Sequence, residues 1–392
     1  MKTAKTAAIC GIASLALAAA GLAGCGDTVD GTKTALVIND EEINVGTANF
    51  YLRHQQAETA NMMQNYGMST SDMMWDQTIS DSQTYGESLK SNCQDSLVEM
   101  VLLRQHAEEY NVSLTDEETQ KIDEAAQQVA DANQDALKRI GATKDDVAQV
   151  LELYTYQQKM REPMIADTDR EVSDEEAAQT TVTYARASLK GDDDAALTDD
   201  EKAALKTEGE EILAQVKGSA DPASADFSTI ASSVGDDFTV SSPSYGSDDT
   251  IVEDAVKNAV AGMSDGQVYD GVLETDDYYY VLRLDHTFDP EATESEKESI
   301  ITERENENYD SKLQGWMDAS TVKTEPAWED IRVTDKDIYI VKPEDTSSES
   351  GTDSSSGSTG SSSGSTDSSS GSTGSSSGNA DSSTGSSAEA GE

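Results

Sequence analysis

Cysteine, proline, aromatic and basic residues are all scarce in this chain of 392 residues, and the shortage of cysteine is the most informative. There are three cysteines: Cys10 and Cys25 lie in the first 25 residues, and Cys93 lies in a helical pattern. A disulfide framework needs several cysteines outside any leader segment, so we expect none. Outside its Ser/Gly-rich tail, the sequence also lacks a Gly-rich phosphate-binding loop, a metal-ligand cluster and a Gly-x-Ser-x-Gly motif, so we expect no metal and no cofactor.

The charge of the chain is strongly of one sign. It has 77 acidic residues against 27 basic residues, a formal net charge of −50. Such a field repels the phosphates of nucleic acid and of anionic lipid, so neither is an expected partner of the folded part. Acidic runs such as Asp192–Asp194 do not follow the alternating pattern of a calcium loop, and we interpret them as solvated surface.

The first 25 residues resemble the signal peptide of a bacterial lipoprotein. Two lysines precede an apolar run, Ala7–Ala20, and small residues then lead to Cys25. The resemblance implies removal of residues 1–24, lipidation of Cys25 and an extracytoplasmic protein anchored in the cell membrane. The alternative is an ordinary secretory signal in which the cysteine occurs by chance. Beyond this leader no stretch approaches about 20 apolar residues, so nothing else is expected to span a membrane.

The remaining sequence divides into a part that can fold and a low-complexity tail. We predict an anchor spacer over residues 25–33, followed by a mainly helical domain built from residues 34–176 together with 289–343. Residues 177–288 are predicted to form a second domain. From residue 344 to residue 392 the chain repeats Ser, Gly, Thr and Asp. Such a tail buries too little apolar surface to offset the entropy of ordering, so we predict that it is disordered.

Two features of the helical domain bear on its structure and use. Ser173 and Glu176 match a capping box and predict the start of a further helix. A stretch rich in methionine and aromatic residues lies between residues 62 and 75. Methionine suits either an adaptable surface for apolar client segments or a core around irregular turns, and we favour the core.

The stretch Asp226–Leu284 resembles the second half of a parvulin-type peptidyl-prolyl isomerase domain. It reads DFSTIASSV, a turn-rich segment, IVEDAVKNAV, GQVYDGVLET and then an alternating strand that begins YYYVLRL. The segment Thr181–Leu189 alternates as the first strand of such a domain should. The strand–turn–helix start at Thr34 resembles the beginning of PrsA- and SurA-like foldases. The resemblance implies an α+β fold, with a mainly helical chaperone-like domain and a small parvulin-like domain on an antiparallel sheet.

The same resemblance points to candidate site residues. In parvulins an apolar pocket lined by Met and Phe holds the proline ring, backed by two histidines and a nearby Cys or Asp. Here Ala187 and Tyr280 take the two histidine positions, Asp237 takes the Cys/Asp position, and Ile251 and Ala255 fall near the Met and Phe. Asp237 and Tyr280 are thus the candidate catalytic residues, and Ala187, Ile251 and Ala255 the candidate substrate pocket. The plainer alternative is a tyrosine in the strand core and an aspartate in a turn.

The function implied by the resemblance is a lipid-anchored factor that assists folding of secreted proteins. Its partners would be unfolded or newly secreted polypeptides and their X–Pro segments. Isomerisation needs no nucleophile, metal or cofactor, because the barrier of about 18–20 kcal/mol comes from amide resonance. Since both histidine positions hold other residues, a non-catalytic chaperone is the alternative. A surface-binding lipoprotein is a third hypothesis, which the helical run Tyr51–Met164 disfavours.

Overall fold

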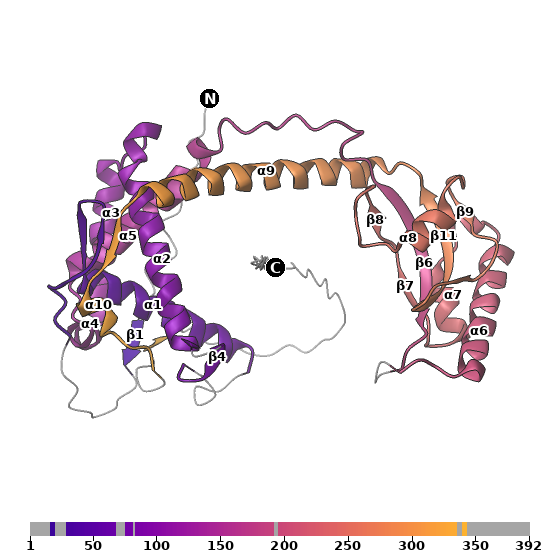
Figure 1. Cartoon of the computed structure of the whole chain (residues 1–392), viewed down its shortest axis with the longest axis horizontal. Coiled ribbons are helices and arrows are strands. Elements are labelled where there is room, and N and C mark those ends of the chain that lie inside the picture. Colours follow the sequence, from indigo (N-terminus) through magenta and orange to yellow (C-terminus); the bar gives the residue numbers. More distant parts are fainter. Residues whose placement is uncertain are drawn as a thin grey trace, which may run out of the picture. The chain divides into compact units, whose positions relative to one another are not determined.

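The fold is α+β, as the sequence predicts, with a helical region and a region built on an antiparallel sheet (Figure 1). The computed structural model describes residues 16–19, 29–67, 75–80, 83–191, 195–334 and 339–342. Cys25, most of the predicted signal peptide, Asp192–Asp194 and the predicted disordered tail from residue 344 lie outside the described residues.

Three long helices of the helical region, α2, α3 and α5, begin at reciprocal side-chain caps. Thr84, Thr115 and Thr143 each accept a hydrogen bond from the backbone N–H three residues on, and the acidic side chain of that residue accepts one in return. This reciprocal cap satisfies two backbone donors that the first turn of a helix leaves unpaired. The helices are α1 (Val45–Asn65), α2 (Tyr85–Gln105), η2 (Ala107–Tyr110), α3 (Asp116–Ala132), α4 (Gln134–Ile140), α5 (Lys144–Met164), α9 (Pro290–Ala319) and α10 (Pro326–Glu329).

Short strands complete the helical region. The order of its three-stranded sheet is β12 (Val322–Thr324), β2 (Thr34–Ile38) and β3 (Glu41–Asn44), and the further pairs are β4 (Thr78–Ser80) with β5 (Gln83–Thr84) and β1 (Ala16–Ala19) with β13 (Tyr339–Lys342). Leu36, Phe50, Leu97 and Trp328 are almost fully buried in one core. That core joins segments from both ends of the folded chain.

The chain joins this core earlier than the predicted spacer allows. The Val29 N–H donates a hydrogen bond to the Arg139 carbonyl at 3.3 Å. Gly31 is buried, and a Cβ at this position would lie 1.7 Å from the carbonyl oxygen of Gly141. Only glycine lets two backbones approach so closely. Residues 29–33 therefore belong to the fold, and the predicted spacer ends by residue 28.

The second region contains a six-stranded sheet in which every pairing is antiparallel. Its strand order is β10-β11-β6-β7, with β8 also paired to β6 and β9 to β11. The elements of this sheet region are β6 (Thr180–Ser188), α6 (Asp199–Gly218), η3 (Pro222–Ser224), α7 (Phe227–Val234), β7 (Thr239–Ser241), β8 (Ser244–Tyr245), α8 (Asp254–Val260), β9 (Gln267–Val268), β10 (Leu273–Glu274) and β11 (Tyr278–His286). The two long strands, β6 and β11, lie side by side at its centre (Figure 1).

The two faces of the sheet carry separate cores, because alternate residues of a strand point to opposite faces. The face under α6 and α7 holds Ala185, Ala187, Tyr279 and Val281, and the face under α8 holds Tyr184, Tyr280, Leu282 and Leu284. Neither core shares a residue with the apolar clusters of the helical region. The sheet region thus has a hydrophobic core of its own.

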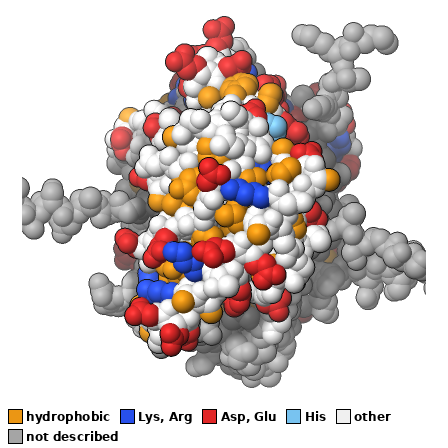
Figure 2. Space-filling model, turned by 90° about the vertical axis from the view of Figure 1, so that its right-hand side faces the viewer, with side chains coloured by type: hydrophobic (Ala, Val, Ile, Leu, Met, Phe, Trp, Pro, Cys, Tyr) orange, Lys and Arg blue, Asp and Glu red, His pale blue; other side chains and the backbone are white. Residues whose placement is uncertain are grey.

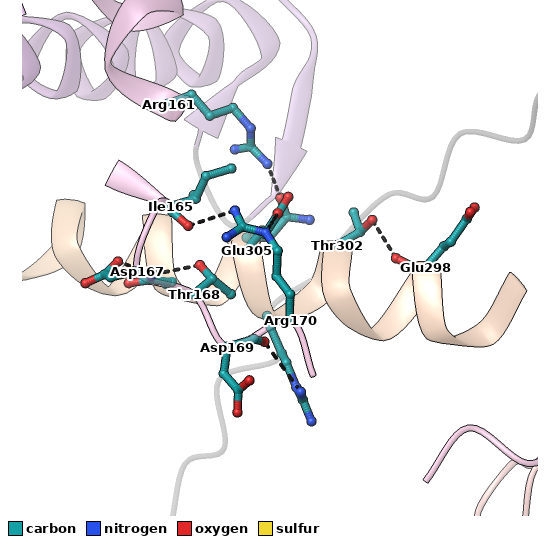
Figure 3. A network of polar contacts seen from close by, with 12 residues as sticks. Arg161, Ile165, Asp167, Thr168, Asp169, Arg170, Glu298, Thr302 and Glu305 are labelled. Carbon is teal, nitrogen blue, oxygen red and sulfur yellow. Dashed lines mark hydrogen bonds and ion pairs between the residues drawn. The ribbon is translucent and has the colours of Figure 1, made fainter. Parts of the chain in front are cut away.

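The segment between α5 and β6 is held along α9 by polar contacts, and we call residues 165–176 the strap (Figure 3). Its ion pairs with α9 are Arg170–Glu305 at 2.7 Å, Asp167–Lys312 at 2.6 Å, Asp174–Lys297 at 2.5 Å, and Glu176–Arg304. The predicted helix start at Ser173 is wrong: a turn forms there, and Arg304 holds Glu176 on α9 instead.

The entry to the sheet and the exit from it are adjacent. The N–H of Asp289, which caps α9, donates to the carbonyl of Gln179, the residue before β6, at 2.8 Å. The N–H of Gln179 in turn donates to the Thr293 hydroxyl at 3.1 Å. The sheet region therefore begins and ends at one point of contact with the first turn of α9.

The methionine-rich stretch is divided between core and surface. Met63 packs against the main core and Trp75 is fully buried, whereas Met62 and Tyr66 are 54% and 82% exposed. Met68, Met73 and Met74 lie outside the described residues. The interpretation as core holds for Met63 and Trp75 but not for Met62 and Tyr66. Within the described ranges, no helix is both long and apolar enough to cross a bilayer.

Candidate functional site

The register of the two central strands decides which predicted residues meet. In the antiparallel pair β6–β11, Tyr280 lies opposite Arg186, and Tyr279 lies opposite Ala187. Residues directly opposite one another point to the same face of a sheet. Tyr280 and Ala187 therefore point to opposite faces. The structure brings together Tyr280 and Arg186, not Tyr280 and Ala187.

Arg186 lies on a group of tyrosine rings on the α8 face. Its guanidinium carbon is 4.8 Å from the ring centroid of Tyr278 and 5.8 Å from that of Tyr184. The rings of Tyr184 and Tyr280 meet edge to face with centroids 5.3 Å apart. A cation over tyrosine faces is attracted by the ring quadrupoles, which holds the half-buried guanidinium in place. Arg186 forms no ion pair with the described residues, although the chain is rich in carboxylates.

Glu253 completes this group, which we call the tyrosine–arginine site. The Tyr280 hydroxyl donates a hydrogen bond to Glu253 Oε1 at 2.9 Å. Glu253 is the residue that immediately precedes α8. Burial, followed by the neighbouring Glu253 carboxylate, raises the pKa of Tyr280, and Arg186 acts in the opposite direction. The hydroxyl is therefore protonated, so it remains the donor in its hydrogen bond to Glu253. Because Tyr280 is only 2% exposed, Arg186, Glu253 and Tyr278 are the members that reach solvent.

Asp237 and Ala187 lie on the other face of the sheet. Ala187 is buried in the core under α6 and α7, so it lines no surface pocket. Asp237 is exposed and lines a cavity of about 370 Å³ beside α6, together with Leu205 and Glu208. Burial, followed by repulsion from Asp237, raises the pKa of Glu208. These residues form a separate acidic hollow that the sheet divides from Tyr280.

The predicted pocket residues Ile251 and Ala255 lie near the start of α8. Ile251 is 66% exposed and precedes the helix, whereas Ala255 is half-buried in its first turn. Val252, between Ile251 and Glu253, packs in the core of the α8 face. The α8 face thus offers an exposed aliphatic side chain in the same short segment as Glu253.

Arg186 and Glu253 are the members of the site that the sequence resemblance misses. Alternation along Thr181–Leu189 puts Arg186 on the same face as Tyr184, and that pattern is visible in the sequence. The pairing register with β11 is not visible there, and a difference of one residue changes which face each side chain occupies.

A larger cavity, of about 470 Å³, lies in the helical region away from these residues, between α2 and the segment after α10. Lys90 lines it, and its ammonium donates to the carbonyls of Glu329 at 3.1 Å and Ile331 at 2.8 Å. Burial, followed by the nearby Arg332, lowers the pKa of Lys90 to about 8. Since its ammonium is engaged by backbone carbonyls, we assign Lys90 a structural role. No cluster of three or more potential metal ligands occurs among the described residues.

Comparison with solved structures finds PrsA proteins. The foldase protein PrsA from Streptococcus pneumoniae str. Canada MDR_19A is 19% identical with a TM-score of 0.26, and the match covers 64% of this chain and 96% of that one. Peptidylprolyl isomerase (PrsA) from Bacillus anthracis is 15% identical with a TM-score of 0.24, covering 57% and 96%. Peptidylprolyl isomerase (PrsA) from Bacillus cereus is 18% identical with a TM-score of 0.24, covering 67% and 94%. No family model and no curated protein sequence matches this chain. Similarity this low carries no argument, so the function must be argued from the residues themselves.

Proposed function

We propose that this chain is a lipid-anchored extracytoplasmic folding factor that binds extended polypeptide on the α8 face of its sheet and isomerises X–Pro bonds there. Unfolded or newly secreted proteins would be its clients, and Cys25 its point of attachment to the membrane. The observation that carries the proposal is the pairing of β6 with β11, which places Arg186 opposite Tyr280, whose hydroxyl donates to Glu253.

To isomerise an X–Pro bond, the site needs only to stabilise the twisted amide more than the planar one. As an X–Pro amide twists, its nitrogen loses conjugation with the carbonyl and its lone pair becomes a hydrogen-bond acceptor. A donor that reaches this nitrogen stabilises the twisted amide but not the planar one, which lowers the barrier. The guanidinium of Arg186 is such a donor at the surface of the site. Tyr184 and Tyr278 hold the guanidinium over their rings, and Tyr280 packs against both of these rings while its hydroxyl donates to Glu253.

The test is a cis–trans exchange measurement by NMR on a proline-containing peptide with the mature, unlipidated chain. We expect wild type to accelerate exchange and Arg186→Met to lose about tenfold or more of that acceleration. A hydrogen bond from a charged donor is worth about 1.5–3 kcal/mol, and about 1.4 kcal/mol is tenfold in rate.

The matched control is Asp237→Asn, on the opposite face of the sheet, which should retain the wild-type rate. If Arg186→Met folds and retains full acceleration, or if wild type shows none, the isomerase part of the proposal is refuted. Equal losses in Arg186→Met and Asp237→Asn would place the site elsewhere.

A non-catalytic chaperone is the second candidate, and specific observations favour it. Tyr280 is almost inaccessible, while Ile251, Met62 and Tyr66 are all more than half exposed. Figure 2 shows apolar side chains across the middle of one face, with basic side chains among them and acidic side chains around them. This candidate predicts suppressed aggregation of an unfolded client with no acceleration of proline exchange, and reduced suppression in Ile251→Ser.

A further inference from the structure

The chain that follows the proposed lipid site is fixed to one place on the helical region. Val29 is hydrogen-bonded to the last turn of α4, and the carbonyl of Gly31 accepts a hydrogen bond from the N–H of Gly46 at 2.9 Å. The carbonyl of Lys33 accepts another from the N–H of Val45 at 2.7 Å. We call residues 29–33 and 138–144 together the anchor corner.

The distance from this corner to the lipid is limited by the length of the chain between them. Only four residue steps separate Cys25 from Val29. A fully extended chain spans at most about 3.5 Å per residue, so the lipidated cysteine lies within about 14 Å of Val29. Acyl chains on Cys25 must be buried in the bilayer. The anchor corner is therefore held within one short tether of the lipid surface.

The exposed charges of the anchor corner suit that surface. Lys33, Lys138 and Arg139 are exposed, and none of them forms an ion pair with the described residues. Such unpaired cations stand out in a chain with 27 basic and 77 acidic residues. Lys138 and Arg139 also lie in the last turn of α4, where they stabilise the negative end of the helix. Asp30 and Asp135, together with Asp27 in the tether and Asp145 at the start of α5, also carry charge here, so the attraction requires Lys33, Lys138 and Arg139 to be the side chains that face the lipid.

Screening decides whether the local cations or the total charge of −50 matters at the membrane. At physiological ionic strength the Debye length is about 8 Å, so acidic residues farther from the lipid contribute little repulsion. A Lys or Arg close to an anionic leaflet contributes about 1 kcal/mol of attraction. The charges within the anchor corner therefore outweigh the more distant ones.

We infer that the anchor corner lies against the phosphate headgroups of the bilayer, with Lys33, Lys138 and Arg139 facing anionic lipid. This inference rests on the proposed lipidation of Cys25. It also assigns an orientation, because the corner at Gly141 is the part of the helical region nearest the membrane.

The test uses the full lipidated chain in vesicles of phosphatidylcholine and phosphatidylglycerol that carry a headgroup-attached quencher. A fluorophore is placed on Thr32→Cys in the corner or, as a control, on Glu58→Cys in α1. Both positions are exposed, and Glu58 lies twelve residues along the helix from Gly46, about 18 Å at 1.5 Å per residue. Cys93 is buried, and burial raises the pKa of its thiol to about 12, so it does not compete for the label.

We expect quenching at position 32 to exceed quenching at position 58 several-fold. Insertion of about ten Gly/Ser residues between Asp27 and Thr28, about 35 Å of extended chain, should bring the two values together while the protein still floats with the vesicles. Lys138→Glu with Arg139→Glu should reduce quenching at position 32 in the same way. Equal quenching at both positions in a floating protein would overturn the inference. A protein that does not float would overturn the lipid anchor itself, and the inference with it.

Discussion

At the scale of single residues, the Tyr280 hydroxyl has one role that can be measured without any client. Tyr280→Phe removes its hydrogen bond to Glu253 and leaves the ring in place. We expect the free energy of unfolding to fall by about 1 kcal/mol, the usual net worth of such a bond. Urea denaturation of both proteins checks this.

Tyr245→Phe is the matched control for this change. Tyr245 packs in the same core, and its hydroxyl makes no hydrogen bond with the described residues. Its loss should leave the unfolding free energy unchanged. Equal effects of the two substitutions would mean that the Tyr280–Glu253 bond contributes nothing.

His54 gives the helical region a dependence on pH. Its Nδ1 is buried without a hydrogen-bond partner among the described residues, and burial lowers the pKa of His54 to about 4. The unfolded chain, with an ordinary histidine pKa of about 6.5, binds a proton more readily in this range. This contribution to stability is therefore complete above about pH 6.5 and is lost as the pH falls toward 4.

His54→Leu should remove this contribution. We expect the stability of wild type relative to His54→Leu to fall by about 1–2 kcal/mol between pH 7 and pH 5. His286→Leu is the control, because the His286 side chain is 53% exposed, and it should keep the wild-type dependence. Parallel curves for wild type and His54→Leu in urea titrations would contradict the prediction.

The sequence predicts which strand carries a candidate residue better than it predicts which residues that side chain contacts. It predicts that Tyr280 is a site residue with Ala187 as its partner, whereas the structure places Arg186 opposite Tyr280. The error is one position, and in a strand one position is the difference between two faces. Glu253 leaves no signal in the sequence, because its contact with Tyr280 spans 27 residues.

At the scale of elements, a glycine substitution tests whether residues 29–33 are packed against the end of α4. Gly31→Ala places a Cβ against the Gly141 carbonyl, so residues 29–33 must move away from α4. We expect a loss of about 1–3 kcal/mol, as for other overpacked sites. Gly315→Ala is the control: it lies inside α9 with no atom within 4 Å of the added Cβ. It should stabilise by about 0.5–1 kcal/mol, and thermal unfolding of both variants shows whether the signs differ.

The strap is held to α9 mainly by charge (Figure 3). Exposed ion pairs contribute little singly and are screened by salt. We expect Arg304→Ala with Lys312→Ala to raise amide hydrogen exchange in residues 165–176 several-fold at low salt. At about 0.5 M salt wild type should approach the variant. Lys217→Ala, which breaks the pair with Asp270 elsewhere, is the control and should leave this segment unchanged.

Elements are predicted better than residues, for a physical reason. Caps such as Thr115 with Glu118 and Thr198 with Glu201 are local, and the structure contains both. The similar pattern Ser173–Glu176 opens no helix: the Ser173 hydroxyl accepts a hydrogen bond from the Glu176 N–H at 3.2 Å, but the Glu176 carboxylate, which would complete the capping box, pairs with Arg304 of α9. A local signal fails there because long-range partners occupy the same groups.

At the scale of the whole molecule, a net charge of −50 should bias the choice of client. A negative field attracts cationic segments and repels acidic ones over about one Debye length. We expect the chain to suppress aggregation of a basic unfolded protein at several-fold lower concentration than that of an acidic one at low salt. At about 0.5 M salt the difference should vanish. Light scattering across a salt series measures this, and a preference that survives high salt would point to apolar contacts instead.

Because Asp289 is hydrogen-bonded to Gln179, the sheet region could be removed from the chain or replaced by another domain. A hundred or so residues leave the chain and return to it at almost the same point, so bridging the cut ends with a very short connector costs little entropy. The sheet region is thus inserted into the helical region, whose own core is built from the segments before and after the insertion. The tyrosine–arginine site could therefore be exchanged or lost together with the sheet region while the helical region still folds.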